Sequence, residues 1–143
     1  MDETDRALLE LLAENARTPV AMLARRLGLA RSTVQARIDR LEARGVIAGY
    51  ALRLGENATR ATIRATVLLM LEPRATAAVL TRLKALPQVE AAHTASGRFD
   101  MILSLAARST AELDDTLDRI GELDGVRGSE SLIHLSTRID RRP

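Results

Sequence analysis

Residues 18–45 read TPVAMLARRLGLARSTVQARIDRLEARG, and this stretch decides the fold of the first part of the chain. Thr18 followed by Pro19 is typical of a helix start, and Gly28 of a helix end, so the pattern predicts a short helix between them. A longer helix follows after a tight turn and ends at Gly45, because apolar residues recur at helical spacing at Val34, Ile38 and Leu41. Two helices joined by a tight glycine turn are typical of a helix-turn-helix unit.

A further helix is predicted ahead of this pair, and a less regular segment after it. Leucines recur at helical spacing between residues 4 and 16, at Leu8, Leu9, Leu11 and Leu12. After Gly45, residues 46–54 contain Gly49 and read as a short hairpin or an extended segment. We therefore expect a helix-turn-helix domain of winged-helix-like form over residues 1–54.

The positive charge of the chain is concentrated in the same region. The 143 residues carry a net charge of only +2. Residues 17–64 hold ten arginines against three acidic residues, a net of +7, whereas residues 1–16 have a net of −4 and residues 65–143 a net of −1. Clustered positive charge on a small unit is typical of proteins that bind a polyanion such as DNA. A solvated basic face and a three-helix bundle that binds protein are the alternatives that charge and helix pattern leave open.

The second helix of the pair is the candidate recognition helix. Its apolar stripe is expected to face inward, so its polar side chains are left to face outward. Serine, threonine, glutamine and arginine side chains contact base edges, and arginines at the margins hold phosphates. We expect base contacts from Arg31, Ser32, Thr33, Gln35, Arg37 and Arg40, and phosphate contacts from Arg25, Arg26 and Arg44.

The residues of this region also resemble those of a known family. The matching positions are Asp5, Leu8, Leu9, Leu12, Arg17, Leu23, Ala24, Leu27, Gly28, Leu29, Ser32, Val34, Arg37, Leu41, Glu42, Gly45, Val46, Ile47, Gly49 and Tyr50. This pattern resembles the leucine-responsive Lrp/AsnC, or feast/famine, transcription regulators, which implies double-stranded DNA as a partner. Members usually open the recognition helix with Ser or Thr, where this chain has Ala30. Loss of a capping side chain costs about 1 kcal/mol, so we expect this helix start to be shifted or capped otherwise.

The rest of the chain contains an internal repeat. Residues 37 apart match at several positions, which include Leu80 with Leu117, Arg82 with Arg119, Leu86 with Leu123, and Val89 with Val126. Strands are expected over 61–72, 88–96, 98–106 and 126–139, and helices over 74–86 and 109–123. This βαββαβ order is the ferredoxin-like plan, so the whole chain is expected to be an α+β protein. A linker over 55–60 would separate the two domains. The family's RAM-type effector domain follows the same plan, so the resemblance extends over residues 61–143.

The two helices of a βαββαβ unit cover one face of its sheet, so the other face needs a partner. The strand over 61–72 is apolar on both sides near its end, with Val67, Leu69 and Leu71 on one side and Leu68 and Met70 on the other. The last strand likewise offers Leu132, Ile133 and Leu135. Strands that are apolar on both faces are buried on both faces. We therefore expect a homodimer formed by sheet against sheet, and the resemblance implies assembly into a tetramer or octamer.

One turn is a candidate ligand site. Residues Ser96, Gly97, Arg98, Phe99 and Asp100 resemble the Gly-x-x-Asp turn of the family, which helps to bind amino-acid effectors where dimers meet. Backbone N–H groups beside Gly97 suit a carboxylate, and Asp100 suits an ammonium group. Many members carry an acidic residue in place of Arg98, so the reversed charge is expected to change the ligand or abolish binding. The alternative is an ordinary hairpin turn with Asp100 as a structural acceptor.

The composition argues against catalysis and metal binding. Cysteine is absent, which excludes disulfides, thiolate catalysis and thiolate metal sites. His93 and His134 are the only histidines, and the βαββαβ plan puts their strands at opposite edges of the sheet. We therefore expect no cofactor, no metal and no enzyme activity. A DNA-bending architectural protein that does not respond to small molecules is the nearer alternative to a regulator.

Nothing in the sequence indicates a membrane or secretion. The apolar runs fall short of the roughly 18 residues that a spanning helix needs. The first residues, Met-Asp-Glu-Thr-Asp, are acidic and lack the basic start and apolar core of a signal peptide. We therefore expect a cytoplasmic, nucleoid-associated protein with no membrane partner.

Overall fold

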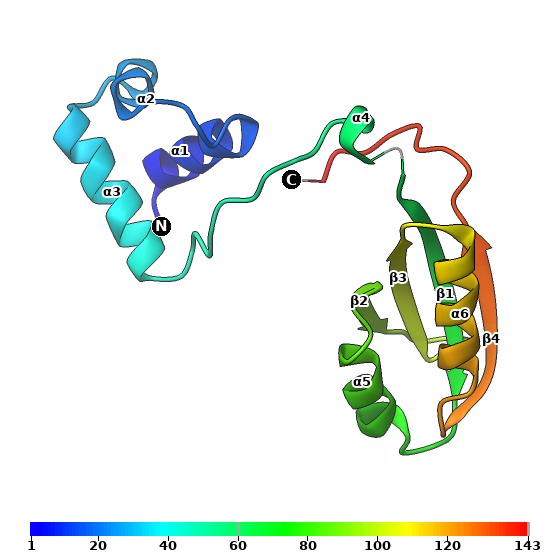
Figure 1. Ribbon diagram of the computed structural model, residues 1–143. Helices are drawn as coiled ribbons and strands as arrows, with labels where there is room; N and C mark the ends of the chain where they lie inside the picture. Colours follow the sequence, from blue (N-terminus) through cyan, green and yellow to red (C-terminus); the bar gives the residue numbers. More distant parts are fainter. Residues whose placement is uncertain (60, 143) are drawn as a thin grey trace. The chain divides into compact units, whose positions relative to one another are not determined.

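The computed structural model describes residues 1–59 and 61–142, which form two compact units (Figure 1). The first unit comprises Met1–Arg53 together with Arg141 and Arg142, and the second comprises Leu54–Asp140. Arg60, the last residue of the expected linker, and Pro143, the last of the expected C-terminal domain, lie outside the described residues. In the described part of the chain, no helix has the length and apolar character to cross a membrane.

Three helices make up the first unit, namely α1 (Glu3–Glu14), α2 (Val20–Leu27) and α3 (Arg31–Ala43). Leu8 of α1, Leu23 of α2 and Val34 of α3 are completely buried in one apolar core. Ile38 and Leu41 of α3 are buried in the same core, so the apolar stripe predicted for this helix is confirmed.

The turn between α2 and α3 depends on Gly28. Its φ of +66° lies in the left-handed region, which a residue without a Cβ adopts at little cost. The Leu29 N–H then donates to the Ala24 carbonyl at 2.9 Å, a bond typical of a glycine-terminated helix. The predicted helix end at Gly28 is therefore confirmed.

The start of α2 differs from the prediction. Thr18 does not cap the helix, because its hydroxyl donates to the Asn15 carbonyl at 2.7 Å in the turn after α1. Helical residues begin at Val20, so Pro19 precedes the helix rather than opening it, and no side chain caps α2.

The segment after α3 is unpaired. Residues 46–54 form no strand, so of the two expected forms the hairpin is wrong and the extended segment is left. The N–H groups of Val46 and Ile47 both donate to the Leu41 carbonyl, at 2.9 and 3.1 Å, which ties the segment back to α3. Inside the stretch expected to be an irregular linker, Glu56–Thr59 form the short helix α4.

Besides the short helix α4, the second unit consists of a four-stranded antiparallel sheet with two helices. Its elements are β1 (Ile63–Leu71), α5 (Thr76–Lys84), β2 (Val89–Thr94), β3 (Met101–Ala107), α6 (Thr110–Gly121) and β4 (Val126–Ile133). The strands lie side by side in the order β2-β3-β1-β4, and both helices lie on one face of the sheet (Figure 1). The predicted βαββαβ ferredoxin-like plan and the α+β class are confirmed.

The core of this unit lies between the sheet and its two helices. Alternate residues of β1, from Ala65 to Leu71, are buried in one cluster with Leu83 of α5 and Ile120 of α6. The other set of β1 side chains, which includes Leu68 and Met70, is only partly buried. The face of the sheet without helices therefore carries apolar side chains such as Leu68 and Met70, with polar ones such as Thr66 and Glu130 among them.

The last strand is shorter than predicted. It was expected over 126–139 but ends at Ile133. The His134 N–H still donates to the Arg64 carbonyl at 2.9 Å, but β1 begins only one residue earlier, at Ile63. Beyond this point β4 has no residue of β1 to pair with, so the strand ends, and Leu135 is 98% exposed.

Candidate nucleic-acid interface and effector cavity

Polar side chains lie along the exposed side of α3. Arg31, Ser32, Thr33 and Gln35 are all exposed. Three further arginines, on α2 and at the end of α3, are exposed as well: Arg25, Arg26 and Arg44. Gln35 donates to Asp39 at 2.8 Å, and Arg26 lies 3.9 Å from Glu14 across the exposed surface. The exposed side of the helix pair therefore carries guanidinium groups together with side chains that contact base edges in protein–DNA complexes.

The N-terminus of α3 is not capped by a side chain. The helix begins at Arg31, directly after Ala30, so its start is neither shifted nor capped by another residue's side chain. Its first-turn N–H groups therefore have no side-chain acceptor at the cap position. Such groups are suited to bind a phosphate oxygen.

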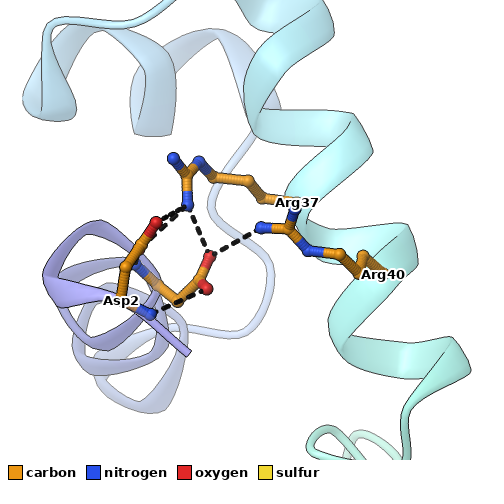
Figure 2. Close-up of polar contacts among 4 residues, drawn as sticks. Asp2, Arg37 and Arg40 are labelled. Carbon is orange, nitrogen blue, oxygen red and sulfur yellow. Dashed lines mark hydrogen bonds and ion pairs between the residues drawn. The ribbon is translucent and has the colours of Figure 1, made fainter.

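The side chain of Arg37 points toward α1, unlike the exposed polar side chains beside it on α3. Figure 2 shows it extending from α3 toward Asp2 at the start of α1. Its Nη1 donates to both carboxylate oxygens of Asp2, at 2.9 and 2.8 Å, and to Oδ1 of Asp5 at 2.8 Å. Arg40 lies 3.5 Å from the same oxygen of Asp5 (Figure 2). The Asp5 side chain is only 4% exposed, so this carboxylate needs the arginine partners.

The expectation that Arg37 faces outward is therefore wrong. Its side chain is only 21% exposed, and it joins α3 to α1. Arg40 is 46% exposed and keeps part of its surface open. The inward position of Arg37 follows from the buried charge of Asp5, which attracts the nearest guanidinium group on α3.

Asp2 and Asp5 are the residues that sequence reasoning missed. Besides binding Arg37, they cap α1: the Asp5 N–H donates to Asp2 at 2.8 Å and the Asp2 N–H donates to Asp5 at 3.2 Å. This reciprocal arrangement is a capping box. Two acidic residues three apart, just before a leucine pattern, are the sequence signal that could have identified it.

The hydrogen bonds of this cluster shift the pKa values of its members. The hydrogen bond from Arg37 lowers the pKa of both Asp2 and Asp5 below their ordinary value of 3.8. Hydrogen bonds to Asp2 and then to Asp5 raise the pKa of Arg37. All three groups therefore stay ionised at neutral pH.

The only tyrosine of the chain also contacts α3. The Tyr50 hydroxyl donates to Oε1 of Glu42 at 2.8 Å, which connects the segment after α3 to its last turn. This hydrogen bond raises the pKa of Tyr50.

The turn from Ser96 to Asp100 lies between β2 and β3, as expected. Gly97 has a φ of +116°, and Ser96, Gly97 and Arg98 are exposed. The Arg98 guanidinium carbon lies 5.0 Å from the centre of the Phe99 ring, within the range of a cation–π contact. Oδ2 of Asp100 accepts a hydrogen bond from the Leu71 N–H at 2.8 Å. One oxygen of Asp100 is therefore a structural acceptor.

An open cavity of about 380 Å³ brings part of this turn together with the end of β1. It is lined by Met70, Leu71, Glu72, Pro73, Arg74, Thr76, Arg98, Asp100 and Arg127. Of the five predicted effector residues, Arg98 and Asp100 line it, whereas Ser96, Gly97 and Phe99 do not. Arg74 and Arg127 were not identified from the sequence, because they reach the cavity from the turn before α5 and from β4.

The two histidines lie apart, as predicted. His93 is on β2 and His134 follows β4, at opposite edges of the sheet. The His134 ring lies 2.8 Å from the Thr66 hydroxyl. Over residues 1–59 and 61–142, no three His, Asp or Glu side chains gather in a way that could hold a metal ion.

A helix-turn-helix unit with an exposed polar helix, followed by a ferredoxin-like unit with a charged cavity, defines a class of DNA-binding regulator with a separate ligand-binding domain. Two family descriptions match the chain: the AsnC-type helix-turn-helix domain over residues 1–42 and the Lrp/AsnC ligand binding domain over residues 64–143. The chain belongs to the Lrp/AsnC family. It is accordingly a transcriptional regulator and not an enzyme.

Named relatives and solved structures agree with this assignment. The HTH-type transcriptional regulator LrpA of Mycobacterium tuberculosis is 33% identical over 143 residues, which cover 99% of this chain and 95% of that protein. The structure of E. coli AsnC matches with a TM-score of 0.89 and 26% identity, covering 100% of this chain and 97% of that one. A feast or famine regulatory protein from M. tuberculosis, complexed with L-methionine, matches with a TM-score of 0.85 and 33% identity, covering 99% of this chain and 97% of that one.

The cluster around Arg37 predicts an acid-sensitive first unit. Because the pKa values of Asp2 and Asp5 are lowered on folding, their stabilisation is complete above about 3.8 and is lost as the pH falls through the lower folded values. The D5N variant should be less stable than the wild type at neutral pH, and its melting temperature should fall less steeply on acidification. Thermal denaturation followed by circular dichroism, from about pH 7 to about pH 3, measures both effects.

The control is E10Q, which changes an exposed carboxylate elsewhere on α1. It should melt like the wild type at every pH. Parallel pH profiles for D5N and E10Q would show that the cluster contributes nothing to acid sensitivity.

Proposed function

We propose that residues 1–54 bind specific double-stranded DNA sites through α3, and that residues 61–143 form the dimer and bind a small effector. The observation that carries this proposal is that one side of α3 is polar and exposed while the other side is apolar and buried. Arg31, Ser32, Thr33 and Gln35 are exposed, while Val34 and Ile38 hold the helix in the core. A helix held by one side and polar on the other is suited to enter the major groove.

The basic residues divide into three roles in this proposal. Arg31 and the polar residues after it contact base edges, and the arginines of α2 together with Arg44 contact phosphates on either side. Arg37 contacts neither, because it holds α3 against α1 through Asp2 and Asp5. A protein that binds DNA in this way would act on the chromosome. We therefore infer that it associates with the nucleoid.

The division between base and phosphate contacts is testable with two variants. R31A should cost about 1–3 kcal/mol on the best site and relax base preference, because it removes a base contact. R25A should weaken all sequences alike and reduce the salt slope of binding by about 1, because it removes a phosphate contact. Fluorescence anisotropy with selected and scrambled duplexes at several salt concentrations measures both.

The matched control for these variants is R82A, an exposed arginine on α5 of the other unit. It should bind both duplexes like the wild type. Equal losses on selected and scrambled DNA for R31A and R25A would contradict the division of roles. Binding that never distinguishes the duplexes would instead support an architectural protein.

The open face of the sheet supports the proposed dimer. Leu68 of β1 pairs with Ile102 of β3, and Thr66 pairs with Leu132 of β4, so these residues point to the face without helices. Leu132 is 50% exposed in the single chain. A second copy of the same face would bury these side chains, and a two-fold dimer would present paired recognition helices to half-sites about 34 Å apart.

The variant L68K tests the dimer. Its ammonium group would be forced into the interface beside Glu130, the residue opposite on β4, and burying such a pair in place of an apolar side chain costs about 1–4 kcal/mol, which should raise the dimer dissociation constant by about tenfold or more. A78K, on the exposed side of α5, should leave the dimer unchanged. Sedimentation equilibrium at micromolar concentration measures both. A monomeric wild type, or dimeric L68K, would refute the sheet-to-sheet arrangement.

The cavity beside the turn of Arg98 and Asp100 supports an effector, and we propose that an amino acid binds there, between dimers in a tetramer or octamer. A relative with 33% identity is complexed with L-methionine. An effector shifts such an assembly only through a difference in affinity for its two states. The effector must therefore contact residues whose positions differ between the two states of the assembly.

Thermal shift against a panel of amino acids tests the effector. Ligand at a hundred times its dissociation constant stabilises the protein by about 2.7 kcal/mol. The R98A variant should lose part of this shift and fold normally, since its side chain is 79% exposed. Asp100 is a poorer choice, because its carboxylate holds the Leu71 N–H. A full shift in R98A would exclude this cavity, and no shift with any amino acid would favour a protein without such an effector.

A further inference from the structure

We propose that the cavity at the end of β1 selects a ligand with a net negative charge, of which a dicarboxylic amino acid is the best match. The inference rests on the proposed effector function and names the chemical class of the effector. It follows from the charges that line the cavity, from the freedom of those groups to bind, and from the backbone conformation at Arg74.

The charged groups of the cavity do not balance. Arg74, Arg98 and Arg127 contribute three guanidinium groups, against the two carboxylates of Glu72 and Asp100. An amino acid with a neutral side chain is a zwitterion, so it would leave this surplus positive charge in place. A second carboxylate on the ligand would pair with the remaining guanidinium group, and arginine binds carboxylates in a directional, two-pronged geometry.

The three guanidinium groups are free to take a ligand. Arg98 lies over the Phe99 ring and 3.8 Å from Glu130, and because the Arg98 and Glu130 side chains are 79% and 51% exposed, both contacts are weak. Over residues 1–59 and 61–142, neither Arg74 nor Arg127 forms an ion pair.

Asp100 is placed to receive the ammonium group of the ligand. Its Oδ2 is held by the Leu71 N–H, and its own N–H donates to the Leu69 carbonyl at 2.8 Å, so both bonds fix the residue at the end of β1. Its Oδ1 accepts no hydrogen bond from any other described residue. The cavity therefore contains one oriented carboxylate for a cation and several guanidinium groups for anions.

The backbone at Arg74 is unfavourable for an arginine. The Ala75 N–H donates to the Glu72 carbonyl at 3.1 Å, which closes a four-residue turn with Pro73 second and Arg74 third. Arg74 has a φ of +68°, the only non-glycine residue with a positive φ over residues 1–59 and 61–142. The third position of such a turn favours glycine or asparagine. An arginine here places a guanidinium group at the cavity at the expense of local stability, and such outliers cluster at binding sites.

Two measurements on the full chain test the ligand class. Thermal shift and isothermal titration should show L-glutamate or L-aspartate binding about tenfold more tightly than L-glutamine or L-asparagine, because the amides match them in size but lack the second charge. Potassium sulfate at equal ionic strength should give a much smaller shift than the favoured amino acid.

The variant R74G separates binding from folding. Glycine suits the positive φ, so the free variant should melt at the same temperature as the wild type or higher. Its affinity for the acidic amino acid should fall about tenfold, while its affinity for the amide should change little. The control R82A should keep the wild-type preference.

The outcomes distinguish this inference from the proposed function. Equal or tighter binding of a neutral amino acid, lost in R98A, would overturn the charge selection and leave the effector function intact. A shift that sulfate reproduces would mean an adventitious anion site and overturn the inference. Unchanged discrimination in R74G would remove Arg74 from the site. No binding of any amino acid would overturn both this inference and the effector function.

Discussion

The burial of β1 is the constraint on which the second unit depends. The strand lies between β3 and β4, so its backbone is hydrogen-bonded on both sides, and its alternate residues form the core under the helices. Its other side is apolar too, at Leu68 and Met70. The same strand end fixes the cavity: the Leu71 N–H holds Asp100, and the next N–H, of Glu72, donates to the Gly125 carbonyl at 2.7 Å. Core, open face and cavity therefore follow from one strand.

The first unit is organised by a competition for guanidinium groups. DNA phosphates and the carboxylates of α1 attract the same side chains, and Arg37 is held by the carboxylates. Removing one strongly basic group from the outer surface lowers its positive charge, but the ion pairs fix α3 against α1. A rigid recognition helix loses less conformational entropy on binding DNA. The cluster of Asp2, Asp5 and Arg37 therefore weakens the attraction of the first unit for DNA phosphates, but it holds α3 in a fixed position before DNA binds.

The periodicity of the sequence was enough to predict the three helices of the first unit and the sheet and two covering helices of the second, but not the short helix α4. Val34, Ile38 and Leu41 recur at helical spacing because they face one core, and the repeat in the second half identified both βαβ copies. The helix caps and the length of β4 were less predictable. The Thr18 hydroxyl bonds to the Asn15 carbonyl instead of capping α2, and the length of β4 depends on where its partner β1 begins.

The charged contacts could not be predicted in the same way. An arginine on a helix surface has the same local pattern whether it faces solvent or a distant carboxylate. Arg37 and its partner Asp2 are 35 residues apart, so only the packing of α3 on α1 brings them together. Likewise Arg74 and Arg127 meet at one cavity only because β4 pairs with β1.

The bond between Tyr50 and Glu42 also gives the protein a built-in optical reporter. The chain has no tryptophan and a single tyrosine, so under excitation at wavelengths that phenylalanine does not absorb, its intrinsic fluorescence comes from one ring in the first unit. A hydrogen bond to a carboxylate quenches phenol emission, so the signal depends on the last turn of α3. A change in that emission when a ligand enters the second unit would reveal communication between the units, with no dye attached.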